Sequence, residues 1–101
     1  MIKYLFLAVV ITLSPRLNLF AQTAEDYFNR GKAEYYNLNF QASLDDYNIA
    51  IALNPNYAAA YSSRGDAKNH LNDKDGACKD WSKAIELGDP DAGLFIKMYC
   101  K

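Results

Sequence analysis

Two segments of this chain carry the same pattern of large and small residues at a fixed distance. Four positions of the first segment have the same or a similar residue 34 positions later (61 − 27 = 34). The pairs are Tyr27 and Tyr61, Gly31 and Gly65, Ala50 and Ala84, and the two large aromatic residues Tyr47 and Trp81. A period of this length is typical of stacked helical repeats, in which each unit buries its apolar face against its neighbour. The repetition therefore constrains the fold more strongly than composition does.

Capping residues predict where the helices of the first segment begin and end. Thr23 and Asp26 have the spacing of a capping box, so a first helix is expected from Ala24. Apolar residues at helical spacing predict a second helix from about residue 41 to 53, after a short turn at 38–40. Pro55 ends this helix because the residue before a proline avoids the helical conformation.

The second segment repeats this arrangement and adds one more helix. A third helix is expected from residue 56 or 57, and a fourth after the turn-forming residues 72–76. Gly88 suits a C-terminal cap and Asp89-Pro90 a new start, which predicts a fifth helix from Pro90 to about Cys100. The sequence shows no alternation of strand type, so the predicted class is all-α.

Small residues in each segment mark places where two helix backbones approach closely. We expect Gly31 to face Ser43 and Gly65 to face Ala77. The large aromatic residues of the repeat would fill the space between successive hairpins.

Residues 1–21 have the features of an export signal. Lys3 precedes an apolar run at residues 4–13, and Ala21 offers a small residue for cleavage. The alternative is a retained membrane anchor, but Pro15, Arg16 and Asn18 interrupt the stretch of about 20 apolar residues that a spanning helix needs. The sequence therefore predicts an exported protein, periplasmic or secreted, without stable membrane insertion after cleavage.

Net charge argues against two classes of partner. Residues 22–101 keep 9 of the 11 basic residues and all 12 acidic ones, for a charge of 9 − 12 = −3. A mildly acidic domain without a basic run has no electrostatic reason to bind nucleic acid or an anionic membrane. We therefore expect neither as a partner.

The repeated residues resemble the pattern of the tetratricopeptide repeat (TPR) family. A first repeat at 24–57 matches at Tyr27, Gly31, Tyr47, Ala50 and Pro55, and a second at 58–91 matches at Tyr61, Gly65, Ala77, Trp81 and Ala84. Arg30 and Arg64 stand where the family usually has leucine. The resemblance implies two helix-turn-helix repeats of an α-solenoid, closed by a capping helix at 90–101, in a small exported bacterial protein.

The resemblance also implies a protein-interaction module whose first helices line a concave groove for a peptide or partner protein. By the family's pattern, the partner-binding residues are Phe28, Lys32, Tyr35, Tyr36, Ser62, Asp66, Asn69 and His70. This set suits an extended segment with apolar and acidic groups. Phe28 and Tyr35 have an alternative interpretation as core residues.

One subtype of the family recognises a C-terminal carboxylate with lysine, asparagine and arginine side chains. The corresponding positions here hold Phe28, Lys32, Ser63 and Asp66. This composition does not favour that use.

Two repeats are fewer than such arrays generally need, so a further source of stability is expected. A disulfide between Cys78 and Cys100 would fix the capping helix, and closing its loop of 22 residues (100 − 78) contributes about 3 kcal/mol. The alternative is a pair of free thiols with Cys78 buried. Self-association through an exposed hairpin face, as a structural subunit, is the alternative function.

Catalysis has little support in the sequence. His70 is the one histidine, and a dyad of His70 with Cys78 would join residues on different helices. No nucleophile motif or phosphate loop occurs, and Cys78, Cys100 and His70 lack a fourth ligand for a metal. We therefore expect a non-enzymatic protein without cofactor or metal.

Overall fold

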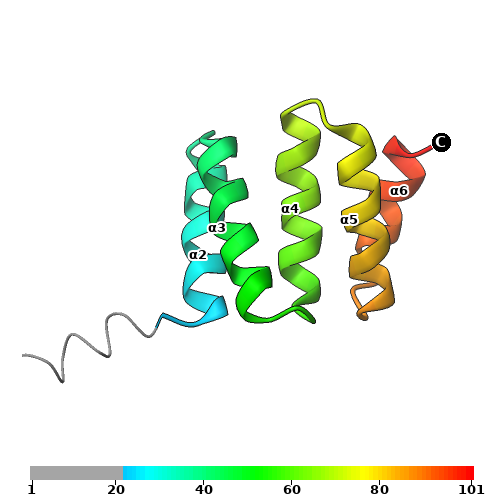
Figure 1. Ribbon diagram of the computed structural model, residues 1–101. Coiled ribbons are helices and arrows are strands. Elements are labelled where there is room, and N and C mark those ends of the chain that lie inside the picture. Colours follow the sequence, from blue (N-terminus) through cyan, green and yellow to red (C-terminus); the bar gives the residue numbers. More distant parts are fainter. Residues whose placement is uncertain (1–21) are drawn as a thin grey trace, which may run out of the picture.

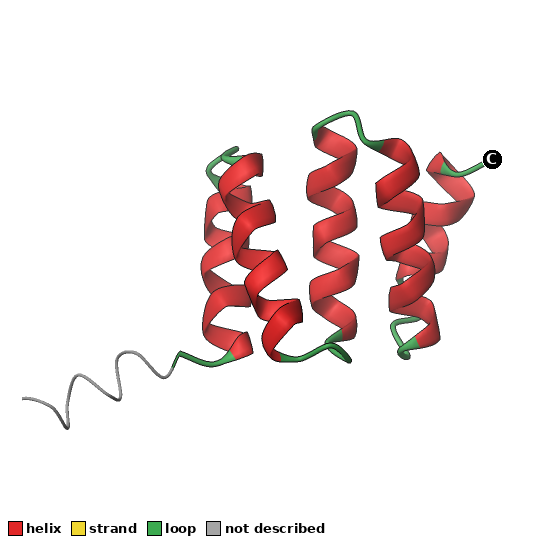
Figure 2. Cartoon of the chain, viewed as in Figure 1, coloured by secondary structure: helices red, strands yellow, loops and turns green. Residues whose placement is uncertain are grey.

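The computed structural model describes residues 22–101, and the predicted export signal at residues 1–21 lies outside this part. The described residues form five α-helices, which are α2 (Ala24–Tyr36), α3 (Phe40–Leu53), α4 (Ala58–His70), α5 (Lys74–Glu86) and α6 (Ala92–Tyr99). Figure 2 shows helices joined by short loops and no strand in this range, so the predicted all-α class is confirmed.

The predicted capping box is present at the start of α2. The backbone N–H of Asp26 donates to Thr23 Oγ1 at 3.1 Å, and the N–H of Thr23 donates to Asp26 Oδ2 at 2.9 Å. These two bonds satisfy donors that a helix start otherwise leaves free. The helix therefore begins at Ala24, as the sequence predicts.

Two later helices begin at other residues than expected. The side chain of Asp73 accepts from the N–H of Gly76 at 2.9 Å, so α5 begins at Lys74 and Gly76 lies in its first turn. Before α6, Asp89 accepts from the N–H of Asp91 at 3.1 Å in a turn. The helix consequently begins at Ala92, two residues after the predicted start.

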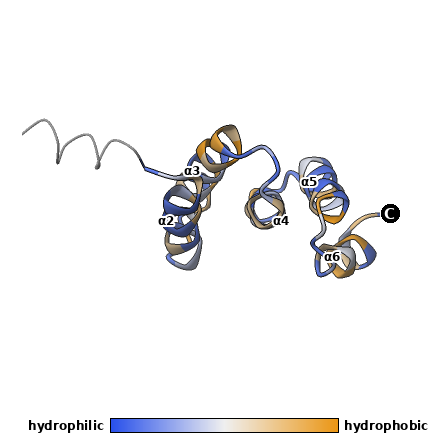
Figure 3. Ribbon diagram, turned by 90° about the horizontal axis from the view of Figure 1, so that it is seen from below, coloured by the Kyte–Doolittle hydropathy of each residue, from blue (hydrophilic) through white to orange (hydrophobic). Residues whose placement is uncertain are grey.

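The helices form two antiparallel hairpins followed by a capping helix. The first hairpin is α2 and α3, the second is α4 and α5, and α6 lies against α5 (Figure 1). Seen along the helices, α2, α4 and α6 lie on one side, and α3 and α5 lie on the other (Figure 3). The first helices of the hairpins thus share one face with the capping helix.

Each hairpin has its own buried aromatic residue. Tyr47 in α3 and Trp81 in α5 are each only 1% exposed, and small alanines surround them. The Trp81 ring stacks on Phe95 of α6, with ring centres 5.4 Å apart. The capping helix therefore completes the core of the second hairpin.

The repeated glycines lie where an aromatic ring crosses the helix. A Cβ atom on Gly31 would lie 2.6 Å from the Tyr47 ring, so Tyr47 is its close neighbour rather than Ser43. At Gly65 the same atom would lie 2.7 Å from the Trp81 ring and 3.1 Å from the backbone oxygen of Ala77. The predicted approach to Ala77 is correct, while the ring contacts were not expected.

An arginine–aspartate pair also repeats with the 34-residue period. Arg30 donates to Asp46 through Nε at 3.0 Å and Nη2 at 2.7 Å, and Arg64 donates to Asp80 at 2.8 and 2.7 Å. Both aspartates are buried within their hairpins. The arginines that depart from the family pattern therefore hold α2 to α3 and α4 to α5.

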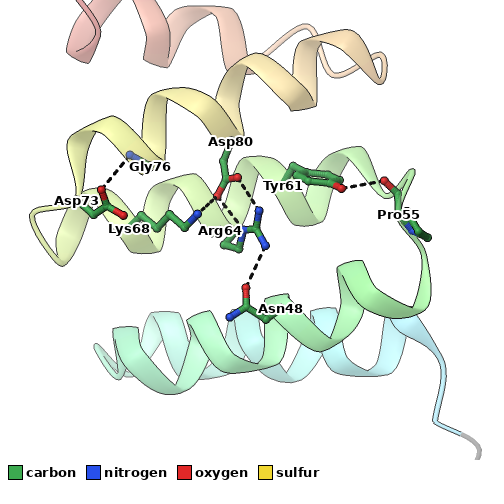
Figure 4. Close-up of polar contacts among 8 residues, drawn as sticks. All are labelled: Asn48, Pro55, Tyr61, Arg64, Lys68, Asp73, Gly76 and Asp80. Atoms are coloured by element: carbon green, nitrogen blue, oxygen red, sulfur yellow. Dashed lines mark hydrogen bonds and ion pairs between the residues drawn. The ribbon is translucent and has the colours of Figure 1, made fainter.

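Figure 4 shows the second of these pairs and its neighbours. Arg64 Nη1 also donates to Asn48 Oδ1 of the first hairpin at 3.0 Å, and Lys68 Nζ lies 3.1 Å from Asp80 Oδ2. The contact with Asn48 links the two hairpins.

Within residues 22–101, no helix combines the length and the apolar character that crossing a membrane requires.

Candidate functional site

A groove runs along the face formed by α2, α4 and α6. Its larger cavity, of about 310 Å³, is lined by Tyr35, Tyr36, Asp66, Asn69, His70, Trp81, Phe95 and Tyr99. A smaller cavity of about 60 Å³ is lined by Lys32, Tyr35, Tyr36, Tyr47, Ser63 and Asp66. Because the two cavities share Tyr35, Tyr36 and Asp66, they form one continuous surface, the concave groove. Most of its lining residues come from α2, α4 and α6, which lie on one side of the molecule in Figure 3.

Six of the eight residues proposed from the sequence line this groove. They are Lys32, Tyr35, Tyr36, Asp66, Asn69 and His70. Ser62 lines neither cavity, whereas its neighbour Ser63 lines the smaller one. Ser63 was named from the sequence only at a ligand position of the subtype that recognises a C-terminal carboxylate.

Phe28 lies in the core rather than on the groove surface. Its ring is 5.0 Å from the Tyr57 ring and 5.8 Å from the Tyr47 ring, and only 9% of the residue is exposed. Lys32 Nζ lies over this ring, 5.3 Å from its centre. Phe28 therefore supports Lys32 from below instead of contacting a ligand.

Aromatic side chains form the two walls of the larger cavity. Tyr35 and Tyr36 come from α2, and Tyr36 is 74% exposed. Phe95 and Tyr99 come from α6. The α6 residues were missed because the fifth helix was interpreted only as a cap, although an aromatic residue at positions i and i+4 places both rings on one face.

His70 lies at one edge of this aromatic cluster. Its ring stacks on Phe40 with centres 4.3 Å apart, and it meets Tyr35 edge-on at 5.5 Å. His70 therefore has a structural role beside its place in the groove.

Asp66 provides the negative charge at the floor of the groove. Trp81 Nε1–H donates to Asp66 Oδ1 at 3.0 Å, which fixes the direction of the carboxylate. Burial raises the pKa of Asp66, while the bond from Trp81 and the proximity of His70 oppose this rise. Burial disfavours the charged form of Asp66 because little water reaches its carboxylate.

Burial also raises the pKa of Tyr35 above its usual value. The same cause raises the pKa of Tyr47, opposed by a hydrogen bond with Ser63. Tyr35 and Tyr47 are therefore neutral at physiological pH.

In the structure a disulfide joins Cys78 of α5 to Cys100 at the end of α6, with Cα atoms 5.9 Å apart. Cys100 directly follows Tyr99, so this link lies beside one wall of the groove. The Cys78 thiol that a dyad with His70 would need is used in this bond. No cluster of three or more His, Cys, Asp or Glu suited to a metal occurs within residues 22–101.

Comparison with known proteins gives relatives but no matching family model. RNA polymerase II-associated protein 3 from Xenopus tropicalis is 44% identical to this chain over 59 residues, and the Homo sapiens protein is 39% identical over 59 residues. Each match covers 58% of this chain and 9% of the relative. The chain thus matches less than a tenth of the length of these relatives.

Solved structures resemble the fold more completely. A structure described as the first TPR of Spaghetti (RPAP3) bound to HSP90 peptide SRMEEVD matches with a TM-score of 0.73 and 30% identity, over 76% of this chain and 63% of that chain. A crystal structure of MamA matches with a TM-score of 0.64 and 33% identity, over 65% of this chain and 39% of that chain. The fold is therefore of the tetratricopeptide type, and one of these neighbours is described as bound to a peptide.

The predicted localisation is contradicted by the curated relatives. They are named for association with RNA polymerase II and not for an exported location, and the organisms compared are not bacteria. The expectation of a periplasmic or secreted protein rested on Lys3, the apolar residues 4–13 and Ala21 as a cleavage residue, which are features that other N-terminal segments can share. Composition of a short N-terminal stretch was not sufficient for that conclusion.

Proposed function

We propose that the concave groove binds an extended peptide segment of a partner protein. The observation that carries this proposal is the continuity of the two cavities across α2, α4 and α6. Aromatic walls supply apolar contact area, and the polar side chains of Ser63, Asp66 and Asn69 lie between them. This combination is typical of sites that bind a peptide by side-chain contacts and orient it with a few polar groups.

The groove is also well supported from behind. Tyr47 and Trp81 line it from below and are almost completely buried in the two cores. A surface with fixed backing side chains loses little conformational entropy when a ligand binds. This rigidity favours peptide binding without rearrangement of the helices.

A solved neighbour supports the same use of the fold, because it holds the HSP90 peptide SRMEEVD. In this chain the positions that would hold a C-terminal carboxylate are occupied by Phe28, Lys32, Ser63 and Asp66. Phe28 is buried, and Asp66 would repel a carboxylate. The bound segment is therefore internal to its partner rather than a free C-terminus.

A displayed heptapeptide library selected on the full chain tests this proposal. We expect selected peptides to lose at least about tenfold in affinity for a Lys32→Ala/Tyr36→Ala variant, because truncating a central tyrosine that is a binding hot spot costs about 2 kcal/mol or more. Amidation of the peptide C-terminus should leave the affinity unchanged.

The matched control is Leu53→Ala/Lys79→Ala, which removes an exposed apolar and an exposed cationic side chain from α3 and α5. This control should bind as the natural chain does. Failure to select any peptide, or equal losses in the two variants, would contradict groove binding.

A further inference from the structure

The larger cavity has an unusual combination of charge and aromatic surface. Asp66 is its carboxylate, and no lysine or arginine is among its lining residues. Across the described residues, Asp66 is not part of any salt bridge, and Trp81 Nε1–H is its hydrogen-bond donor. Among the described residues Asp66 therefore has no ion-pair partner, although His70 lines the same cavity.

Aromatic residues make up most of the remaining lining of this cavity. Tyr35 and Tyr36 meet edge-to-face with ring centres 5.7 Å apart on the α2 wall. On the α6 side, Phe95 and Tyr99 lie 5.4 and 5.7 Å from the Trp81 ring. The faces of such rings carry negative electrostatic potential, which attracts a cation as the carboxylate does.

We infer that this cavity binds a cationic side chain, arginine or lysine, of the peptide that occupies the groove. This inference rests on the proposed function and adds the chemistry of one ligand residue. The volume of about 310 Å³ is large enough for such a side chain. The ammonium or guanidinium group would meet Asp66, while its aliphatic stem would lie between the Tyr36 and Tyr99 rings.

The smaller cavity shares Asp66 with the larger one and adds a cation, which helps to set direction. Lys32 lines it, and its Nζ is held over the Phe28 ring. A ligand with a cation in the larger cavity and an apolar or acidic residue in the smaller one would match both. The acidic preference expected from the sequence thus applies only to the end of the groove that contains Lys32.

The heptapeptides selected on the full chain provide the test. We expect them to share one arginine or lysine, and its replacement by methionine to weaken binding about tenfold, the effect of one or two cation–π contacts with a charge pair. In Asp66→Asn, which removes the charge pair and leaves only the cation–π contacts, this replacement should weaken binding by about threefold or less. Asp45→Asn, which alters an exposed carboxylate on α3, should keep the full tenfold preference.

Trp81 reports on the site directly, because it is the one tryptophan of the chain and its indole N–H donates to Asp66. Its indole NMR signal should shift with the arginine-containing peptide and shift less with the methionine peptide. Asn can still accept this bond, so Asp66→Asn is expected to fold. Should it not fold, Tyr36→Leu keeps the apolar volume of a 74% exposed residue and should also reduce the preference.

The outcomes separate the two proposals. Peptides that bind the groove without a required cation, or a preference that survives both Asp66→Asn and Tyr36→Leu, would overturn this inference and leave groove binding intact. Failure to select any groove-binding peptide would contradict the proposed function itself.

Discussion

The two hairpins contain the same arginine–aspartate pair in different surroundings. The Arg30 side chain is 55% exposed, whereas the Arg64 side chain is 19% exposed, although both form the same two hydrogen bonds with an aspartate 16 residues later. Arg64 is covered because the first hairpin lies beside it and contributes Asn48. The repeated sequence thus gives equal geometry, and the neighbouring hairpin determines how far each pair is removed from water.

Gly65 of the second hairpin, like Arg64, is more closely surrounded than its counterpart in the first hairpin. An added Cβ on Gly65 would meet both the Trp81 ring and a backbone oxygen, while one on Gly31 would meet only side-chain atoms. Gly65→Leu is therefore expected to unfold the domain, and Gly31→Leu to be less damaging, because a ring can shift and a packed backbone cannot. Far-UV circular dichroism and melting temperature measure both. An equal or reversed order would contradict this difference between the hairpins.

The disulfide connects α6 only to the second hairpin. Replacing both Cys78 and Cys100 by serine should lower the free energy of unfolding by about 3 kcal/mol, because the unfolded chain loses the constraint of a 22-residue link. Urea unfolding with and without a dithiol reductant provides the measurement. An unchanged midpoint, or two alkylatable thiols in the unreduced protein, would show that the link is not formed.

Replacing the aspartate of each ion pair by alanine should affect stability differently in the two hairpins. Asp80→Ala removes the partner of Arg64 and of Lys68, both largely covered, and should lower the unfolding free energy by about 2–3 kcal/mol. Asp46→Ala leaves a more exposed Arg30, which water can solvate, so its effect should be smaller. Urea denaturation of the two variants measures the difference. Equal losses would mean that the neighbouring hairpin does not change the environment of the pair.

The turn inside each hairpin contains one residue in a left-handed conformation, and the type of this residue differs between the two hairpins. Leu38 has φ 66° and Asn72, 34 positions later (72 − 38), has φ 67°. Leucine is disfavoured in this conformation by about 1 kcal/mol, whereas asparagine tolerates it. Leu38→Asn should therefore raise the free energy of unfolding by up to about 1 kcal/mol, and Asn72→Leu should lower it. A loss of stability in Leu38→Asn would show that the exposed Leu38 side chain makes contacts that outweigh the strain.

The fold was largely predictable because its signals are local and occur twice. The 34-residue period, the Thr23 and Asp26 capping box, and Gly88 at positive φ all correspond to features of the structure. The arginine–aspartate pairs were not predicted, although the period contains them. Arg30 and Arg64 were considered only as departures from a family pattern, and their partners lie 16 residues away on another helix.

The site was less predictable because it depends on which helices come together. Tyr36 and Asp66 could be proposed from their positions in the repeat, and both line the groove. Phe95 and Tyr99 belong to the capping helix, outside the repeated segments. For Phe28 the sequence left both a groove and a core interpretation open, because its place in the pattern does not reveal that Tyr47 and Tyr57 pack against it.

Mapping the NMR shifts of backbone amides during titration with a selected heptapeptide tests the central claim most directly. We predict that the largest shifts occur at Tyr36 on α2, Asp66 on α4 and Tyr99 on α6, together with the indole N–H of Trp81. Ile49 on α3 and Ile85 on α5, which are exposed away from this cavity, should change little. Shifts concentrated on α3 and α5, with the groove residues unaffected, would contradict peptide binding by the concave groove.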